Sequence, residues 1–314
     1  MSSQDISKAV AILRQGGLVA IPTETVYGLG ADATNPAALR KIFVAKERPM
    51  DHPLIVHLAS VSQLSDWAVD VSEIALLLAK TFWPGPLTLI LKKAPQVSDW
   101  VTGGQDTVGV RVPNHPVAHA LLQEFRGGLA APSANRFGRI SPTSAGAVRE
   151  ELGDAVDLIL DGGVCEVGVE STIVDVSDGT PVILRPGMIS SSDIERVLAR
   201  SVAHQKKNAP RVSGSHESHY APRTRTRLIQ AENIESFLQA VSAPIALVTL
   251  NPIELQRENV FSVVMSNQAR QYAHDLYQTL RELDKKNFRE IVIEAVPEGV
   301  EWDAVRDRLG RASG

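Results

Sequence analysis

The first 200 residues alternate short apolar runs with segments of helical periodicity, which is typical of an α/β layer fold. The apolar runs are rich in β-branched residues and predict strands at 17–21, 54–58, 87–92, 107–112, 156–160, 171–176 and 182–184. Amphipathic segments between them predict helices at 36–45, 72–82, 116–125 and 192–201. Because several strands are separated by only a turn, we expect a mixed sheet rather than a purely parallel one.

The periodicity disappears between residues 204 and 227, where six residues are Lys or Arg and only Glu217 is acidic. This stretch is interpreted as a linker. Beyond it, the pattern predicts strands at 227–230, 245–250, 260–264 and 290–295, alternating with helices at 233–241, 269–285 and 302–311. The expected organisation is a large α/β domain at 1–203, a basic linker at 204–226 and a small α/β domain at 227–314.

Length and composition agree with two globular domains. The chain has 314 residues, of which 44% are hydrophobic and 22% charged. Aromatic residues make up only 5%, and the net charge is -4. Both values argue against a protein that wraps nucleic acid, although a local basic pocket remains compatible with them.

The single cysteine, Cys165, excludes a disulfide framework and any multi-cysteine metal site. The first nine residues lack the charged and apolar pattern of a secretory signal, and no stretch approaches the roughly 20 apolar residues of a membrane span. A cytoplasmic enzyme or binding protein is therefore expected, without a membrane partner.

Familiar nucleotide and metal motifs are weak in this chain. There is no G-x-x-x-x-G-K-[ST] loop, and Gly28 to Ala33 only imitates the dinucleotide fingerprint, because the polar run at 22–27 interrupts the strand that should precede it. A nicotinamide-dependent dehydrogenase is kept as a third possibility. His115 and His119 lie four residues apart, but no glutamate follows the first, so no metal site is predicted.

Polar and basic side chains gather instead in four loops near predicted strands, where α/β folds place their sites. These loops contain Pro22 to Leu29, Lys46 to His57, Asp106 to Pro113 and Ala130 to Thr143. Lys46 and Arg48 also stand at the end of a predicted helix, so stabilisation of the helix dipole is an alternative role for them.

Taken in order, the segments resemble one family. The matching segments are PTETVYGL at 22–29, KERP at 46–49, DHPLIVH at 51–57, WPGPLT at 83–88, DTVGVRVP at 106–113, APSAN at 131–135, GVESTIV at 168–174 and LRPG at 184–187. Together they resemble the YrdC-like family, the threonylcarbamoyl-AMP synthases, over residues 6–198. HYAP at 219–222 and RASG at 311–314 resemble the long form of that family. The resemblance implies a YrdC-like twisted mixed sheet flanked by helices, joined by a linker to a smaller Rossmann-like α/β domain.

The resemblance also implies a nucleotidyltransferase that converts L-threonine, bicarbonate and ATP into threonylcarbamoyl-AMP and pyrophosphate. This reaction is the first step in forming threonylcarbamoyladenosine beside the tRNA anticodon. By family analogy the threonine site contains Thr25, His57, Arg111, Ala131 and Ser171. The ATP site contains Arg48, His52, Thr107, Ser133, Asn135, Ser141, Arg185 and Tyr220. Lys46 and Arg48 are the expected catalytic residues.

The residue types fit these roles, because an arginine fork suits a carboxylate and cations neutralise phosphates. A carbamate formed on threonine would attack the α-phosphate, so no protein nucleophile is needed. Mg²⁺ is expected with ATP, without a nameable protein ligand. Glu170 is interpreted either as a base or as a structural carboxylate. A separate threonylcarbamoyl transferase complex is the expected downstream partner.

Two alternatives stay open on the sequence alone. The linker is either a lid that closes over the pocket or a solvated connector, and its stretch at 211–216 departs from the family pattern. An RNA-binding module is the rival from another functional class, because a pocket that accepts triphosphate also suits RNA backbone.

Overall fold

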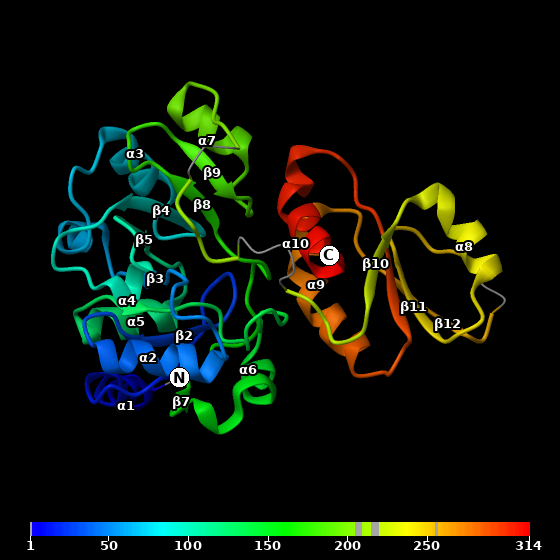
Figure 1. Cartoon of the computed structure of the whole chain (residues 1–314), viewed down its shortest axis with the longest axis horizontal. Helices are drawn as coiled ribbons and strands as arrows, with labels where there is room; N and C mark the ends of the chain where they lie inside the picture. Colours follow the sequence, from blue (N-terminus) through cyan, green and yellow to red (C-terminus); the bar gives the residue numbers. More distant parts are fainter. Residues whose placement is uncertain (1, 205–208, 215–219, 255–256) are drawn as a thin grey trace. The chain divides into compact units, whose positions relative to one another are not determined.

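The computed structural model describes residues 2–204, 209–214, 220–254 and 257–314 (Figure 1). The chain divides into two compact units, which are considered separately. The first unit contains Met1–Phe137 and Ser141–Ser215, and the second contains Gly138–Ile140 and His216–Gly314. Within the described ranges, every helix is too short or too polar to cross a membrane.

A mixed sheet organises the first unit, and its nine strands in the described part of the chain follow the order β7-β1-β2-β6-β3-β5-β4-β8-β9. Neighbours pair in parallel at β1–β7, β3–β5 and β4–β8, and the other pairs are antiparallel. The strand bounds are β1 Val19–Ile21, β2 Gly28–Asp32, β3 Ile55–His57, β4 Leu87–Lys92, β5 Thr107–Arg111, β6 Leu129–Ala130, β7 Leu158–Ile159, β8 Thr172–Asp175 and β9 Val182–Arg185. The predicted mixed sheet is confirmed.

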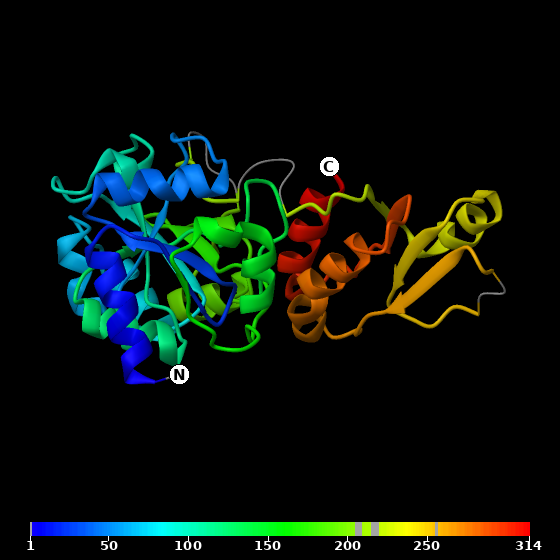
Figure 2. The same cartoon turned by 90° about the horizontal axis from the view of Figure 1, so that it is seen from below.

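Helices cover both faces of this sheet, because its strands bury apolar side chains on both sides. In β1, Val19 and Ile21 pack with helices α1 and α5, whereas Ala20 joins the larger core on the opposite face. Figure 2 shows α1 and α2 on opposite sides of the strands. The helix bounds are α1 Ser3–Arg14, α2 Pro36–Lys46, α3 Glu73–Phe82, α4 Asp99–Thr102, α5 Pro116–Phe125, α6 Ala145–Leu152 and α7 Ser191–Leu198.

The second unit is a parallel four-stranded sheet, in the order β10-β13-β11-β12, with helices on both faces. Figure 1 shows α8 on one side of this sheet and α9 and α10 on the other. The elements are β10 Thr226–Ile229, α8 Ile234–Ala240, β11 Ile245–Thr249, β12 Val260–Val264, α9 Ala269–Asp284, β13 Glu290–Glu294 and α10 Asp303–Ser313. This confirms the small Rossmann-like α/β domain.

Several elements of the first unit escaped the sequence pattern. Gly28–Asp32 forms strand β2, which pairs with β1 through the partners Val19 and Gly30. Two glycines and an aspartate hide this strand, since all three are rare in strands. Residues 28–33 therefore do not form a dinucleotide fingerprint, which requires a turn before a helix, and their likeness to it is a chance resemblance, as the sequence favoured. Strand β6 and helices α1, α4 and α6 were also not predicted, although Ile6, Ala9, Val10 and Leu13 of α1 have helical spacing.

Candidate functional site

Arg111, the last residue of β5, is the centre of a buried polar cluster. It is only 4% exposed. Its Nε donates to the carbonyl of Gly85 at 3.2 Å, and its Nη1 donates to Thr25 Oγ1 at 2.9 Å. Its Nη2 lies 2.6 Å from Glu24 Oε1. The loop between β1 and β2 therefore brings both Thr25 and Glu24 to this arginine.

His57 lies next to Arg111 because β3 and β5 are parallel and these two residues are register partners. The histidine is buried, and its Nδ1 lies 3.3 Å from the carbonyl oxygen of Ile55. Burial, together with the charge of Arg111, lowers the pKa of His57 from 6.5 to about 3. His57 is therefore a neutral side chain at physiological pH.

Ser171, in the loop before β8, and Ala131, just after β6, belong to the same region. The backbone N–H of Gly168 donates to the carbonyl of Thr25 at 3.2 Å, and that of Ala131 donates to Ile55 at 3.0 Å. Arg185 Nη2 donates to the Ser171 carbonyl at 2.9 Å and to its hydroxyl at 3.1 Å. Thr25, His57 and Arg111 therefore lie together, Ser171 contacts Arg185 and Ala131 contacts strand β3. That all five bind threonine stays a prediction.

Lys46 is the last residue of helix α2. Asn35 caps the start of that helix, and Glu47 adopts a left-handed conformation with φ of 53° at its end. Lys46 Nζ is buried and donates to the carbonyls of Ser133 and Asn135, both at 2.5 Å. Burial, followed by the charge of Arg48, holds the pKa of Lys46 well below its usual value of 10.5.

Arg48 and Arg185 meet at Ser213, which belongs to the predicted linker. Arg48 Nη2 donates to Ser213 Oγ at 3.4 Å, and Arg185 Nη1 donates to the Ser213 carbonyl at 2.8 Å. Arg211 forms an ion pair with Asp51 at 3.2 Å. The described start of the linker therefore packs against the first unit, beside two of the expected phosphate ligands.

The remaining residues predicted for ATP differ in their surroundings. Ser141 Oγ donates to Glu170 Oε1 at 2.5 Å, which supports the structural interpretation of Glu170. The ring of His52 meets that of Phe137 edge-on, with 5.1 Å between centroids, and Thr107 lines a small cavity of about 10 Å³ with Arg211 and Ser213.

Tyr220 belongs to the second unit, where it is buried. Its ring stacks on Tyr277 with centroids 5.8 Å apart, and the guanidinium of Arg308 lies 5.1 Å from the ring centroid. Its contact with the nucleotide stays a prediction. His219 and the other residues at 215–219 lie outside the described part of the chain, so the proposed lid motif is described only from Tyr220 onward.

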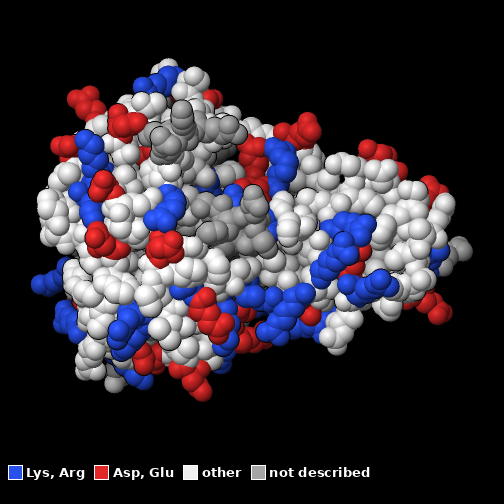
Figure 3. All heavy atoms as spheres, viewed as in Figure 1, with Lys and Arg blue, Asp and Glu red and all other residues white. Residues whose placement is uncertain are grey.

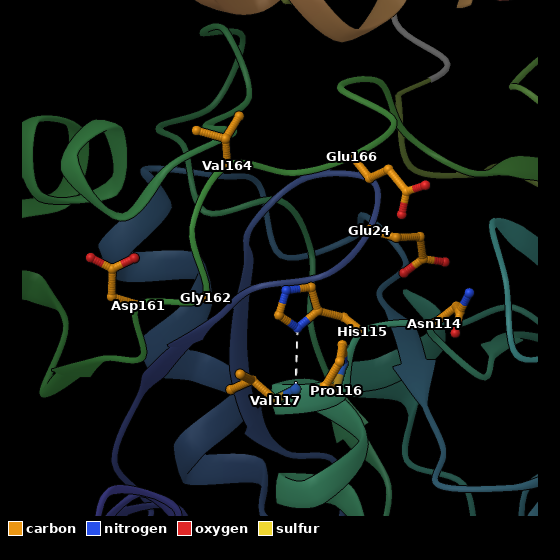
Figure 4. Close-up of a pocket in the computed structure, with 9 residues that line it drawn as sticks. All are labelled: Glu24, Asn114, His115, Pro116, Val117, Asp161, Gly162, Val164 and Glu166. Carbon is orange, nitrogen blue, oxygen red and sulfur yellow. Dashed lines mark hydrogen bonds between the residues drawn. The ribbon is translucent and has the colours of Figure 1, made fainter. Parts of the chain in front are cut away.

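Sequence reasoning missed Glu24. Its side chain is only 3% exposed, and it lines a pocket of about 520 Å³ beside His115, Asp161 and Glu166 (Figure 4). The sequence feature that could have indicated a functional role for Glu24 is its position between Thr23 and Thr25 in the PTETVYGL segment. Its ion pair with Arg111 joins two residues that are far apart in the sequence, so no local pattern reveals it.

Comparison with known proteins identifies the family to which the chain belongs. The family model described as "Telomere recombination" matches residues 11–187, and the model described as "Threonylcarbamoyl-AMP synthase, C-terminal domain" matches residues 189–314. The threonylcarbamoyl-AMP synthase of Pyrococcus abyssi is 38% identical over 98% of this chain and 93% of its own length. The chain belongs to the threonylcarbamoyl-AMP synthase family.

Two further comparisons concern a solved structure and a shorter relative. The crystal structure of P. abyssi Sua5 complexed with L-threonine superposes with a TM-score of 0.91 at 37% identity, covering 100% of this chain and 95% of that one. The threonylcarbamoyl-AMP synthase of Alkalilimnicola ehrlichii is 42% identical over 180 residues, which are 56% of this chain and 94% of the relative. Family membership identifies the protein as an enzyme.

Proposed function

We propose that the chain is an L-threonylcarbamoyladenylate synthase and a nucleotidyltransferase. It converts L-threonine, bicarbonate and ATP into threonylcarbamoyl-AMP and pyrophosphate, the first step of tRNA threonylcarbamoyladenosine formation. The observation that carries this proposal is the buried arginine Arg111 beside Thr25 and neutral His57, in the same unit as the buried cations Lys46 and Arg185. Such a unit offers one place for a small carboxylate and another for a triphosphate.

In this proposal Arg111 binds the threonine carboxylate, because its planar fork matches a carboxylate and is held rigidly by Gly85 and Thr25. His57 and Ser171 supply neutral polar contacts, and Ala131 supplies a small apolar wall. The relative crystallised with L-threonine supports an amino-acid site in this fold.

Lys46, Arg48 and Arg185 bind the triphosphate of ATP and neutralise the charge that develops at the α-phosphate. Hydrogen-bonding groups for the nucleotide come from His52, Thr107, Ser133, Asn135, Ser141 and Tyr220. The described residues contain no group of three or more His, Cys, Asp or Glu placed to hold a metal ion. Mg²⁺ bound together with ATP would help these cations to neutralise the phosphate charge.

The reaction needs positioning and charge stabilisation rather than a protein nucleophile. A carbamate oxygen on threonine attacks the α-phosphorus, the bond between the α- and β-phosphates breaks, and pyrophosphate leaves. In this proposal the catalytic domain comprises residues 1–203, the linker comprises 204–226 and the small domain comprises 227–314. We place the reaction in the cytoplasm, upstream of a threonylcarbamoyl transferase complex.

An RNA-binding module is the less favoured alternative. A nucleic-acid surface gathers Lys and Arg into a patch. Figure 3 shows acidic and basic side chains interspersed over the face in view, and the net charge of the chain is -4. These observations favour the enzyme.

The deciding experiment measures pyrophosphate release from ATP by the full chain. We expect release only when threonine and bicarbonate are both present, and threonylcarbamoyl-AMP should be detected by mass spectrometry. Release without threonine, or no release at all, would overturn the proposal. Titration with a nicotinamide cofactor should give no spectral change, which would dispose of the dehydrogenase interpretation.

A further inference from the structure

Glu24 is buried without the contacts that a buried carboxylate normally has. Its side chain is 3% exposed, and no hydrogen bond from any described residue reaches either carboxylate oxygen. Arg111 Nη2, 2.6 Å from Oε1, also lacks a partner with hydrogen-bond geometry. Burying a carboxylate without hydrogen bonds is energetically unfavourable. A structural ion pair would satisfy these groups, so the arrangement points to a ligand that completes it.

The charges of Arg111 and Glu24 are complementary to the two charges of an α-amino acid. An amino acid carries a carboxylate and an ammonium on one carbon, and the pair presents a guanidinium and a carboxylate in direct contact. Arg111 has five N–H groups. Gly85 and Thr25 accept two of them, and the remaining N–H of Nη1 and the N–H groups of Nη2, which lies 2.6 Å from Glu24 Oε1, are available to a bound carboxylate. The unbonded oxygen of Glu24 is then the natural acceptor for the ammonium.

The neighbouring groups are poor proton acceptors for that ammonium. His57 is neutral, with its pKa lowered to about 3 by burial and by Arg111, so it binds a proton weakly at neutral pH. His115 Nδ1 accepts a hydrogen bond from the N–H of Val117 at 3.2 Å, and this bond caps helix α5. Glu170 already accepts from Ser141. Among the described groups of this region, Glu24 remains the buried base with free acceptor positions.

We propose that Glu24 binds the α-ammonium group of threonine and accepts its proton, so that the free amine can form the carbamate. This inference rests on the proposed function and adds the base that the reaction requires. It assigns to Glu24 both recognition of the amino group and general-base catalysis. The adjoining pocket of about 520 Å³, which Glu24 lines, gives the proton a route to solvent.

Atoms and charges balance in this step. The N–H bond of threonine's ammonium breaks, and Glu24 takes the proton, leaving a neutral amine. The nitrogen lone pair then forms a C–N bond with bicarbonate, which loses the elements of water and leaves a carbamate. Glu24 releases its proton to water in the pocket and returns to its anionic form.

Glu24→Gln tests the proposal, because the amide keeps the size of the side chain but cannot accept this proton. The matched control is Glu166→Gln, a change of the same kind at an exposed carboxylate of the same pocket. We expect Glu24→Gln to slow pyrophosphate release at about pH 7 by roughly 100-fold or more, and Glu166→Gln to leave it within about twofold.

The pH profile separates a base from a structural residue. Without a base, the variant depends on amine that is already deprotonated in solution, and that fraction rises about tenfold per pH unit below the amine pKa. The ratio of wild-type to Glu24→Gln rates should therefore fall about tenfold per unit from about pH 7 to about pH 8.5. A purely structural role would lower the rate by a constant factor, and a constant ratio would overturn the proposal.

Folding and function are checked separately. If Glu24→Gln does not fold, Glu24→Asp keeps the charge but draws it back by one methylene, and we expect at least about a tenfold slower rate. A wild-type rate in Glu24→Asp would count against Glu24 as the base. If the wild type itself releases pyrophosphate without threonine, the proposed function fails. If the wild type behaves as expected and Glu24→Gln stays within about twofold of it, only this inference fails.

Discussion

Single side chains in the first unit carry charge in places that water hardly reaches. Lys46, Arg111 and Arg185 expose 2%, 4% and 3% of their surface, respectively. Buried charges interact strongly with a bound anion, since little solvent screens them. They also make ligand binding sensitive to protonation, and three variants at this level test the site.

Arg111→Lys should impair threonine use selectively. Lysine keeps the positive charge beside Glu24 but loses the fork that binds a carboxylate in two places. We expect the KM for threonine to rise about 10- to 100-fold and the KM for ATP to change less than about threefold. Steady-state kinetics measure both, with the exposed Arg196→Lys as control. Equal effects on the two substrates would refute the assignment of Arg111.

Lys46→Met should reduce kcat about 100-fold or more, because it removes a cation from the phosphate site while keeping the apolar stem. Lys41→Met is the matched control on the same helix. Lys41 Nζ donates to the Gly16 carbonyl at 2.7 Å, and this change should alter kcat less than about twofold. A normal rate in Lys46→Met would show that Lys46 only stabilises the end of helix α2 and does not act in catalysis.

The lowered pKa of Lys46 gives this test a second readout. A bound triphosphate favours the protonated lysine, so ATP binding should take up at most about one proton from solution. Calorimetry in buffers of different ionisation enthalpy measures that uptake. It should be smaller in Lys46→Met.

His57 should make the folded chain sensitive to acid. Its pKa is about 3 in the folded chain and 6.5 ordinarily, so the unfolded chain binds the proton first as the pH falls. The free energy of unfolding should therefore decline as the pH drops from about 6.5 towards 3. Between about pH 7 and about pH 5 we expect the loss to be about 2 kcal/mol smaller in His57→Gln. Urea unfolding without substrates measures it, and an identical loss in both proteins would contradict the neutral His57.

The neighbouring segments of the sheet hold these side chains in place through close backbone contacts. Gly187 follows β9 and lies against the start of β8, where a Cβ added to this glycine would come within 2.3 Å of the Thr172 nitrogen and 2.8 Å of the Ser171 carbonyl carbon. The glycine of the LRPG segment therefore lets the chain pass directly behind Ser171. This close contact between the segment that contains Gly187 and the start of β8 also places Arg185 beside the Ser171 carbonyl.

Gly187→Ala should push the backbone at residue 187 away from the start of β8. We expect a loss of about 2 kcal/mol or more in stability and a reduced affinity for threonine, because the methyl group meets backbone that cannot move aside. Gly146→Ala is the control, since Gly146 is exposed in α6 and its added Cβ would meet nothing closer than Ser144 Oγ at 3.9 Å. That change should stabilise the chain by up to about 1 kcal/mol. Thermal unfolding and threonine titration of both variants check the pair.

The molecule as a whole divides its sequence between two units, and the proposed threonine residues all belong to the first. The relative from A. ehrlichii is covered to 94% by 180 aligned residues, which leaves no room for both units. A family member can therefore consist of about one unit. We therefore predict that the second unit of this chain is not required for amino-acid binding.

A chain ending at Ser215 should fold and bind threonine with an affinity within about threefold of the full chain. The reason is that Arg111, Glu24 and His57 are held by contacts within the first unit. Calorimetric titration with threonine measures the affinity, and circular dichroism checks the fold. Loss of threonine binding in a folded truncated chain would show that the second unit completes the site.

The sequence predicted most of the fold because most elements have strong local signals. Strands β4 and β12 and helix α5 begin and end where the pattern placed them. Strand β2 was missed because it gains its stability from pairing with β1 rather than from the propensities of its own residues.

For the site, too, some features follow from the sequence and others only from the tertiary structure. The sequence by itself determined the family and the types of charged and polar residues at the site, because ordered motifs record those directly. Only the tertiary structure decided that Glu24 and Arg111 are paired out of water, that His57 is neutral and that Ser213 meets two arginines. Burial and charge proximity depend on contacts between distant segments, and the local pattern of residues does not contain that information.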